Sequence, residues 1–587
     1  MSFSDQLRAC EAHLAAECYA LPAPYPAHAL FFSVSDGSAR AHVVHASGPD
    51  VQTAWSAGVK RLTEWMAGQR LVAPWLRVDW VEGARAVTWN RLLEQLELTK
   101  RNYFRYGIAL DERFEIALTE QELNANAMLY GGAHIEHAVV NLKNFKLYAR
   151  SRFGAEAAID LPPSGPAYLL AMRGVFCHTD GIAHPLCGSG LNAGRREPEA
   201  VTAALALELA CSGAAFLARQ VGPGGRFVHG HFPCFDRPIP TYNAERHAVA
   251  LQAMIEAWVC RPDDPLRDAI ERAAEHLALE LVRHYRLPDG HELAFLVDGD
   301  EIRLGGSAAC LLALVQYSDA LGSTRWLTLL ERLAEGVLWL QDPATGRFDC
   351  VLHAPDLSPK PAVSTSHDDG LAAFALMRLH GFTRDARWLA AVEKAFEYFI
   401  DHEQWRAHDH WIGRCVNDLV ALRPDERYVR FGLLNAADHL DFALDRKTTF
   451  PTLLELLLAA QALVERIRTM PSMTPLLALI DTDKLNRAVA HRAHYQLNGV
   501  VWPEMAMYFK HPAAVLGAFF IRHQSFRVRI DDVAHYLSGF LAYHRLFDEA
   551  DVESASDAMA QASAPPDDLP AVGLIALPAR VDQHVSM

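Results

Sequence analysis

The sequence predicts a mainly α protein, with an N-terminal α+β domain followed by a closed ring of six helical hairpins, an (α/α)6 toroid. Three observations favour this class. The chain has 587 residues, more than one ordinary compact core holds, so two or three structural units are expected. Helical segments follow one another after residue 197, and a short turn motif recurs between them.

The composition is that of a globular protein, and the charge argues against two classes of partner. Hydrophobic residues make up 51% and charged residues 21% of the chain, whose formal net charge is −16. Nucleic acids and anionic lipids both attract clustered cations, and the sequence has no basic block. We therefore expect neither nucleic acid nor a membrane as a partner. The N-terminus shows no basic start followed by an apolar core, so no secretory signal is recognised and a cytoplasmic location is expected.

Residues 1–150 are expected to form the α+β domain. Two apolar runs, 29–34 and 39–44, flank Asp36-Gly37, which is a hairpin signal. The periodicity of the apolar residues further predicts a helix over 50–68, a strand over 75–81 and mainly helical structure over 89–128.

Three further segments complete the predicted organisation. Pro, Gly and short polar residues dominate 151–197, which we interpret as a linker, although 168–176 also has strand character. The toroid is expected over 198–547. An acidic tail over 548–587, without Lys or Arg up to residue 578, is expected to be disordered. Helical candidates in the toroid lie near 198–220, 242–260, 265–285, 305–321, 323–341, 367–381, 385–402, 411–420, 425–443, 451–468, 483–495 and 530–547.

A turn motif repeats between the helices of the ring. The stretch Ser-Thr-Arg-Trp-Leu at 323–327 recurs as Asp-Ala-Arg-Trp-Leu at 385–389 and more loosely as Asp-Glu-Arg-Tyr-Val at 425–429. Each copy begins with a residue suited to cap a helix, and a short turn makes the two flanking helices antiparallel. A Gly-Arg-Phe element recurs in longer loops, at 225–227 and 346–348. Short and long connections alternate, which favours a closed ring over an open solenoid or an irregular bundle.

The turn, the Gly-Arg-Phe loops and the number of helix pairs resemble the six-hairpin, (α/α)6-toroid superfamily. Its members include unsaturated glucuronyl hydrolases, sugar 2-epimerases, uronate C5-epimerases, polysaccharide lyases and lanthionine cyclases. The resemblance covers roughly residues 198–547 and concerns the architecture, since no member's complete active-site motif is matched. It implies a funnel lined by the starts of the inner helices and by the long loops that precede them. The first 150 residues resemble no family that we can name.

Three polar and aromatic clusters lie at such helix starts, and the first contains Tyr242, Arg246 and His247. An arginine fork binds carboxylates and a histidine titrates near neutrality, so this group is suited to hold an anionic sugar and to move a proton. The alternative is structural: Asn243 caps the helix, and the two basic side chains pack against their neighbours.

The second cluster is His367, Asp368 and Asp369. Two carboxylates beside a histidine are suited to general acid–base catalysis. Aspartate is also favoured in the first turn of a helix, because it complements the helix dipole. The sequence leaves both interpretations open.

The third cluster runs from Trp405 to Trp411 and contains His408-Asp409-His410. An indole ring stacks on a sugar while a histidine acts at its edge, which assigns binding to Trp411 and proton transfer to His410. The three polar residues are also metal-ligand types, but neither HExxH nor paired CxxC spacing is present, and no metal is expected. No phosphate loop or dinucleotide fingerprint is found, so no cofactor is expected either.

Glu455 is a carboxylate on an apolar helix. Thr452 and Glu455 fit a capping box, which accounts for the acid without a functional role, yet Glu455 stays a candidate for substrate binding in the funnel. Asp531 and His535 lie one turn apart on the last expected helix, and we interpret them as a cap and a hydrogen-bonded core histidine.

The leading hypothesis is a cytoplasmic carbohydrate-active enzyme: a hydrolase, lyase or epimerase that acts on a uronic or amino sugar through acid–base residues in the funnel. The assigned catalytic residues are His247, His410, Asp368 and Asp369, and the assigned substrate-binding residues are Tyr242, Arg246, His367, Trp411 and Glu455. The alternative is a non-catalytic or peptide-handling toroid that docks a partner enzyme, with the N-terminal domain as adaptor. An enzyme requires these groups to converge at one mouth of the ring, whereas a platform does not.

Overall fold

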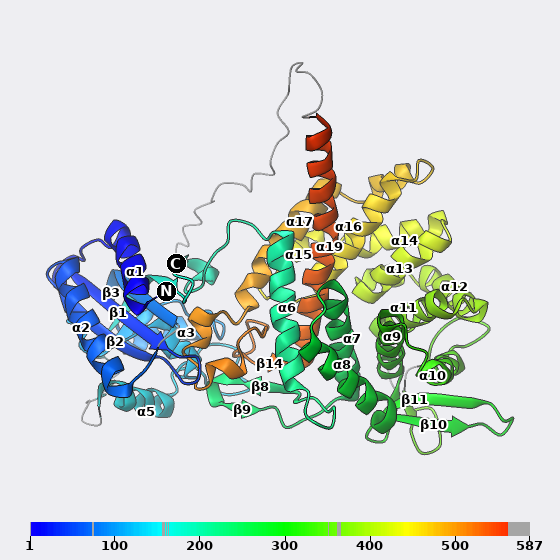
Figure 1. Ribbon diagram of the computed structural model, residues 1–587, viewed down its shortest axis with the longest axis horizontal. Helices are drawn as coiled ribbons and strands as arrows, with labels where there is room; N and C mark the ends of the chain where they lie inside the picture. Colours follow the sequence, from blue (N-terminus) through cyan, green and yellow to red (C-terminus); the bar gives the residue numbers. More distant parts are fainter. Residues whose placement is uncertain are drawn as a thin grey trace.

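The computed structural model describes residues 2–72, 75–154, 159, 161, 164–349, 351–360 and 366–561. Figure 1 shows the two parts of the chain side by side, an α+β domain in blue and cyan and a larger helical part in green to red. Both parts of the expected fold are therefore present.

A seven-stranded sheet forms the centre of the N-terminal domain. β1 (His28–Ser35) and β2 (His42–Gly48) make the expected hairpin, and β1 also pairs with β3 (Trp75–Thr88). The strand order is β2-β1-β3-β6-β4-β5, with β7 beside β6. The remaining strands are β4 (Gly107–Ala109), β5 (Ala117–Leu118), β6 (Pro166–Cys177) and β7 (Ala183–Leu186).

The two faces of this sheet are covered by different partners. α1 (Phe3–Glu17) and α2 (Val51–Gln69) pack on one face, where Phe32 belongs to their shared core. Phe31 points to the other face and belongs to the core of the helical ring. Successive side chains of a strand alternate between faces, so an apolar strand such as β1 is buried on both sides. The sheet thereby fixes the N-terminal domain against the ring.

Two expectations for this domain are wrong. The stretch 89–128 is helical only over α3 (Trp89–Glu97) and α4 (Glu120–Ala125), with β4 and β5 between these helices. The segment 151–197 is no linker, because β6 lies inside the sheet between β3 and β4. The strand character noted for 168–176 belongs to β6, but its pairing with β3 joins residues far apart in sequence, and no local pattern specifies such a partner.

Each helix expected over 198–547 is found. The helices of the ring are α6 (Ala203–Gln220), α7 (Ala244–Cys260), α8 (Asp264–His276), α9 (Leu304–Leu321), α10 (Leu327–Trp339), α11 (Ser366–Thr383), α12 (Ala386–Asp401), α13 (His410–Leu422), α14 (Glu426–Ala437), α16 (Thr452–Arg468), α17 (Thr482–Gln496) and α19 (Ile530–Gln561). α8 ends earlier than expected, because a single π turn and β10 (Val282–Arg286) follow it.

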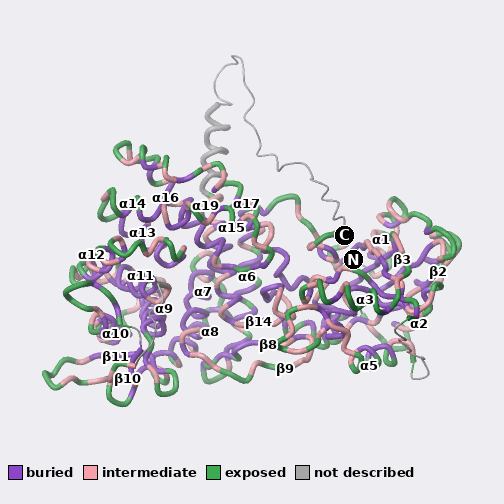
Figure 2. Tube along the Cα trace, turned by 180° about the vertical axis from the view of Figure 1, so that it is seen from behind, coloured by how far each residue is buried: buried purple, intermediate pink, exposed green. Residues whose placement is uncertain are grey.

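Six inner helices close the ring. In the order α7, α9, α11, α13, α16 and α19, each helix contacts the next, and α19 contacts α7. The outer helices pack behind them, and α6 packs on both α19 and α7, so the first and last helices of the domain meet. Figure 2 shows these inner helices as largely buried. The fold is therefore a closed (α/α)6 toroid, and an open superhelix is excluded.

The repeated turn has the role that its sequence indicates. Asp385 and Asp425 each cap a helix by accepting a hydrogen bond from the backbone N–H two residues on. The aromatic residue of each copy is buried, with Trp388 fully so and Trp326 and Tyr428 nearly so. The first copy departs from the pattern, because Ser323 does not cap α10, which begins only at Leu327.

Two elements need separate comment. α9 is long and apolar enough to span a membrane by length and composition alone, but 83% of its apolar window is buried among the other helices, as expected for a core helix. α19 continues to Gln561, past the expected start of the tail at residue 548. The rest of the expected tail, 562–587, lies outside the described residues.

Candidate functional site

The inner helices of the ring run parallel, so their N-termini lie at one mouth. Residues from the starts of several inner helices are in contact there. The side chain of Arg246 on α7 pairs with Asp531 on α19, and His367 on α11 pairs with Asp409 before α13. The candidate site is built from these helix starts.

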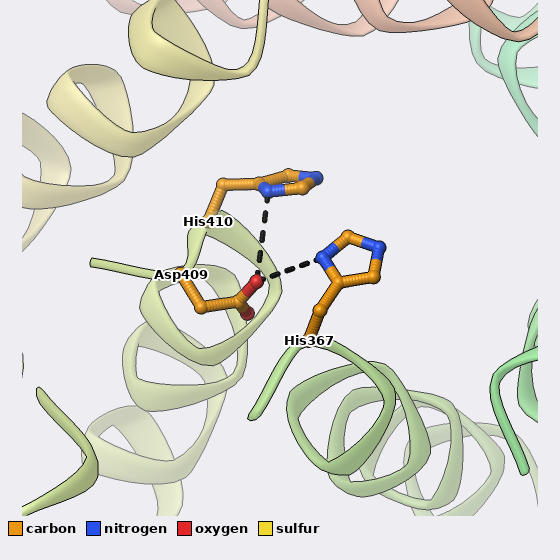
Figure 3. A group of neighbouring side chains, drawn as sticks. All are labelled: His367, Asp409 and His410. Atoms are coloured by element: carbon orange, nitrogen blue, oxygen red, sulfur yellow. Dashed lines mark hydrogen bonds and ion pairs between the residues drawn. The ribbon is translucent and has the colours of Figure 1, made fainter. Parts of the chain in front are cut away.

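His367, Asp409 and His410 form the centre of the site, and Figure 3 shows the two imidazoles beside the carboxylate. Nδ1 of His367 lies 3.0 Å from Oδ2 of Asp409, and Nδ1 of His410 lies 3.9 Å from the same oxygen. Asp409 is the N-cap of α13, where its other oxygen accepts the backbone N–H of Ile412. Asp409 therefore has two roles: one carboxylate oxygen caps α13, and the other holds His367.

A second histidine–carboxylate pair lies next to the first. Nδ1 of His535 on α19 is 2.9 Å from Oε1 of Glu455 on α16. The His410 ring lies between the two pairs, with its centroid 5.4 Å from that of His367 and 5.2 Å from that of His535. Nε2 of His410 has no hydrogen-bond partner in the described part of the chain. Three imidazoles from three inner helices thus meet at this mouth.

The three histidines have different protonation tendencies. Burial lowers the pKa of His367, but the hydrogen bond and charge of Asp409 outweigh it, and the pKa is raised from its usual value. The same balance raises the pKa of His535, with Glu455 as the carboxylate. Burial holds the pKa of His410 well below its usual value, and the neighbouring His535 and His367 lower it further. The cluster therefore combines two imidazoles that favour the proton with one that stays neutral.

A carboxyl pair extends the site toward α7 and α9. Burial raises the pKa of Glu245, and the charge of Asp368 adds to this effect. An added Cβ at Gly305, in the first turn of α9, would lie 2.3 Å from Oδ1 of Asp368. Only glycine leaves room for this carboxylate at the start of α9, so the backbone there is shaped around Asp368.

Arg246 completes this mouth. Its Nε lies 3.1 Å from Oδ2 of Asp531, and its Nη1 donates to Nε2 of His229 at 3.1 Å. Its side chain is 36% exposed, and that of His367 is 43% exposed, so both reach solvent from a largely buried cluster. The expected sharing of one mouth by Arg246 and His367 is what the structure shows.

His247 and Tyr242 lie elsewhere, and their assigned roles in the site are corrected. His247 is fully buried: its Nδ1 lies 2.6 Å from the Tyr242 hydroxyl and its Nε2 lies 2.9 Å from the carbonyl oxygen of Ala273 on α8. Neighbouring residues of a helix point in different directions, so Arg246 faces the mouth while His247 faces the outer helix. Burial lowers the pKa of His247 to about 3. It is a structural residue between α7 and α8.

We expect His247→Gln to make the protein less sensitive to acid. The unfolded chain protonates this histidine below a pKa of about 6.5, whereas the folded protein resists until about 3, so His247 lowers stability as the pH falls between these values. One proton corresponds to about 1.4 kcal/mol per pH unit. Urea unfolding at several pH values should show the slope of the unfolding free energy reduced by this amount. Equal slopes in both proteins would contradict it.

The other predicted residues occupy distinct places. Asp369 is buried and lies 3.4 Å from Nε2 of Gln404, on the outer side of α11, which argues against direct contact with substrate. Trp411 is buried below the histidines, with its ring 4.7 Å from that of His410, so it supports the cluster and offers no open face for stacking. Glu455 lies in the cluster, as expected, but as the partner of His535.

Four residues of the cluster were not assigned a role from the sequence. The sequence predicts Asp409 only as part of the His408-Asp409-His410 group and Asp531 and His535 as a cap and a hydrogen-bonded core histidine, and it assigns no role to Glu245. Each occupies the first turns of an inner helix, where capping explains the residue type equally well. The spacing of Asp531 and His535, one helical turn apart, is the sequence feature that could have indicated a functional histidine. Only the structure shows that His535 on α19 lies beside His410 on α13.

Two groups of three side chains bring donor atoms to within 4.8 Å of one another: His367, Asp409 and His410, and His410, Glu455 and His535. In each group one histidine nitrogen is already hydrogen-bonded to the carboxylate, and His410 belongs to both groups. Such spacing also suits a metal ion. The expectation of no metal stays a prediction and is tested below.

Comparison with known proteins gives likeness in structure alone. No family model and no curated protein matches the sequence. Among solved structures, a cellobiose 2-epimerase from Spirochaeta thermophila is 15% identical, with a TM-score of 0.42 over 58% of this chain and 97% of that chain. A D-mannose isomerase is 11% identical, with a TM-score of 0.45 over 58% of this chain and 97% of that chain.

An α-1,6-mannanase from Salegentibacter is 10% identical, with a TM-score of 0.41 over 58% of this chain and 99% of that chain. The expected architecture, a closed ring of paired helices, is present in this chain by its own helix contacts. Fold does not fix function. The chemistry of this chain is therefore argued from its own side chains.

Proposed function

We propose that the chain is a sugar epimerase or isomerase that moves a proton to and from the carbon beside a sugar carbonyl. The observation that carries this proposal is the contact of a neutral imidazole, His410, with two imidazoles that favour the proton, His367 and His535. Removing a proton from one face or position and returning one at another requires a base and an acid together. The wider class, a carbohydrate-active enzyme, agrees with the names of the structures similar in fold.

The roles follow from exposure and hydrogen bonding. His367 is the most exposed of the three and meets the sugar at the mouth, while Asp409 holds its ring and stabilises the imidazolium. His410 offers the unpartnered Nε2 as the base, and His535 with Glu455 returns the proton. Arg246 and the N-termini of the inner helices stabilise the negative charge that develops on the carbonyl oxygen. The hydroxyl-rich sugar needs no metal in this scheme.

Hydrolysis of a glycoside is the second candidate, and one observation favours it. Glu245 has a raised pKa beside Asp368, and an acid next to a second carboxylate is the pair that glycosidases use. In that case the histidines would be positioning residues. The two reactions differ in what they release, so one experiment separates them.

The test is incubation of the protein with reducing sugars and uronates in D2O, followed by proton NMR. An epimerase or isomerase exchanges the hydrogen beside the carbonyl for deuterium and forms the epimer or ketose. A hydrolase leaves that hydrogen in place and releases new reducing ends from glycosides, which would overturn the proposal. Neither reaction with any sugar would favour the docking platform. Activity that survives EDTA treatment supports the metal-free scheme, and activity restored only by added zinc would contradict it.

We expect Arg246→Ala to weaken binding of uronates while binding of the uncharged sugars changes little. A charge-assisted hydrogen bond contributes about 1.5–3 kcal/mol, so KM for a uronate should rise about 10-fold to 100-fold. Asp531 keeps a cationic partner in the variant, because Nη2 of Arg529 also lies 3.2 Å from it. An equal rise in KM for uronates and for uncharged sugars would show that Arg246 only stabilises the structure of the site.

A further inference from the structure

A cavity of about 800 Å³ lies inside the ring, lined by all six inner helices, and it extends from the C-terminal ends of α7 and α9 to Glu455 in the first turn of α16. The histidine cluster lies at the N-terminal ends, and Glu455 is the residue at which the cluster and the cavity adjoin. Volumes of this size are typical of small-molecule sites, and apart from Glu455 none of the lining residues has a role in the proposed function.

Polar atoms without a hydrogen-bond partner in the described part of the chain surround this cavity, although two of them, Nη1 of Arg414 and Oε2 of Glu455, form an ion pair at 4.0 Å. Four lining residues each carry a buried atom that has no hydrogen-bond partner among the described residues: Oε1 of Gln316, Nη1 of Arg414, Oδ1 of Asn417 and Oε2 of Glu455. They come from three of the inner helices, α9, α13 and α16, and include both donors and acceptors. Buried polar groups are normally satisfied, so a gathering of unsatisfied ones around one cavity points to a ligand that supplies the missing bonds.

The charge of the lining selects the class of ligand. Arginines and carboxylates both line the cavity, and Arg414 is already paired with Glu256. The C-terminal ends of the inner helices add partial negative charge, which disfavours an anion. Trp258 and other apolar residues line the remaining wall. Hydrogen-bonding groups of both kinds beside an aromatic ring fit an uncharged molecule with many hydroxyl groups.

We propose that this cavity is a second binding site, for an uncharged sugar of one or two rings, which adjoins the histidine cluster at Glu455. The sugar hydroxyls donate to Gln316, Asn417 and Glu455 and accept from Arg414. Glu455 also holds His535 through its other oxygen. The test therefore leaves Glu455 and Arg414 unchanged, because substituting them would disturb the histidine cluster as well.

Isothermal titration with D-glucose, cellobiose and D-glucuronate tests the site on the full chain. The wild type should bind D-glucose or cellobiose. Ala462→Trp fills the cavity from α16 and should weaken that binding at least 10-fold, while Ala390→Trp, on the exposed side of the outer helix α12, should not. These readings do not depend on turnover, so the site and the proposed reaction can fail separately.

Gln316→Leu is a second variant of the cavity, which tests the site even if Ala462→Trp does not fold. It removes an unsatisfied acceptor, so it should raise Tm without sugar and yet weaken sugar binding about 10-fold. The proposal is overturned if neither D-glucose nor cellobiose binds the wild type. It is also overturned if Ala462→Trp and Gln316→Leu bind as the wild type does, or if D-glucuronate binds this cavity as tightly as D-glucose.

Discussion

Replacement of His410 or His535 by alanine is expected to lower turnover by about 10²-fold to 10⁴-fold, the usual contribution of a general acid or base. Both residues lie in the histidine cluster, where burial lowers the pKa of His410 and the carboxylate of Glu455 raises the pKa of His535. Turnover of the sugar identified by deuterium exchange is the measurement, and circular dichroism shows whether each variant is folded. Wild-type turnover in both variants would remove the cluster from the mechanism.

The pH dependence of the same reaction should reflect the direction of each pKa shift. Activity should fall on the acidic side as His410 becomes protonated, well below its usual pKa, and on the alkaline side as His535 loses its proton above about 6.5. Glu455→Gln removes the charge that raises the pKa of His535 and should move the alkaline limb to lower pH. If Glu455 had only a structural role, Glu455→Gln would lower the rate without moving the alkaline limb of the profile.

Asp79→Ala is expected to destabilise the protein by about 3–5 kcal/mol, the usual effect of removing one partner of a buried ion pair. Nη2 of Arg77 lies 2.7 Å from Oδ1 of Asp79, and both side chains are almost fully buried. Nη1 of Arg77 also donates to the carbonyl oxygens of Gly194 and Glu504, at 2.9 Å each, and so joins the sheet to the ring. Without Asp79 this guanidinium stays buried with no carboxylate.

Urea unfolding followed by tryptophan fluorescence measures this effect. Asp79→Asn keeps an acceptor for Arg77 and should lose less stability, and the double variant Arg77→Met, Asp79→Leu should recover much of the loss because it buries no charge. Turnover below the melting temperature should be unchanged, since the pair lies far from the histidine cluster. A change of less than about 1 kcal/mol for Asp79→Ala would show that water reaches the arginine.

The ring was predictable because its signals are local. The apolar faces of the helices and the repeated turn around Trp388 depend on residues that are close together in the sequence. Each expected helix is found. The N-terminal sheet was only partly predictable. The β1–β2 hairpin has its own turn residues, whereas β6 enters the sheet by pairing with the distant β3.

The sequence predicted where polar residues gather but not which of them are in contact. Sequence reasoning placed polar residues at the helix starts of one mouth, and Arg246, His367 and His410 are there. It included His247, because adjacent positions of a helix look equivalent in a list of residues, although they face different neighbours. It did not assign His535 to the site, because a histidine one helical turn after an acid is also typical of a hydrogen-bonded core residue.

The sequence by itself determined the class of the fold, the number of helical hairpins and the concentration of acid–base residues at the starts of the inner helices, because these depend on periodicity and capping. Only the tertiary structure decided that α19 closes on α7, that Asp409 and Glu455 each hold a histidine, and that His410 lies between the two pairs. The reason is physical. Contacts between helices far apart in the chain depend on side-chain packing across the ring, and no local pattern of residues specifies which faces will meet.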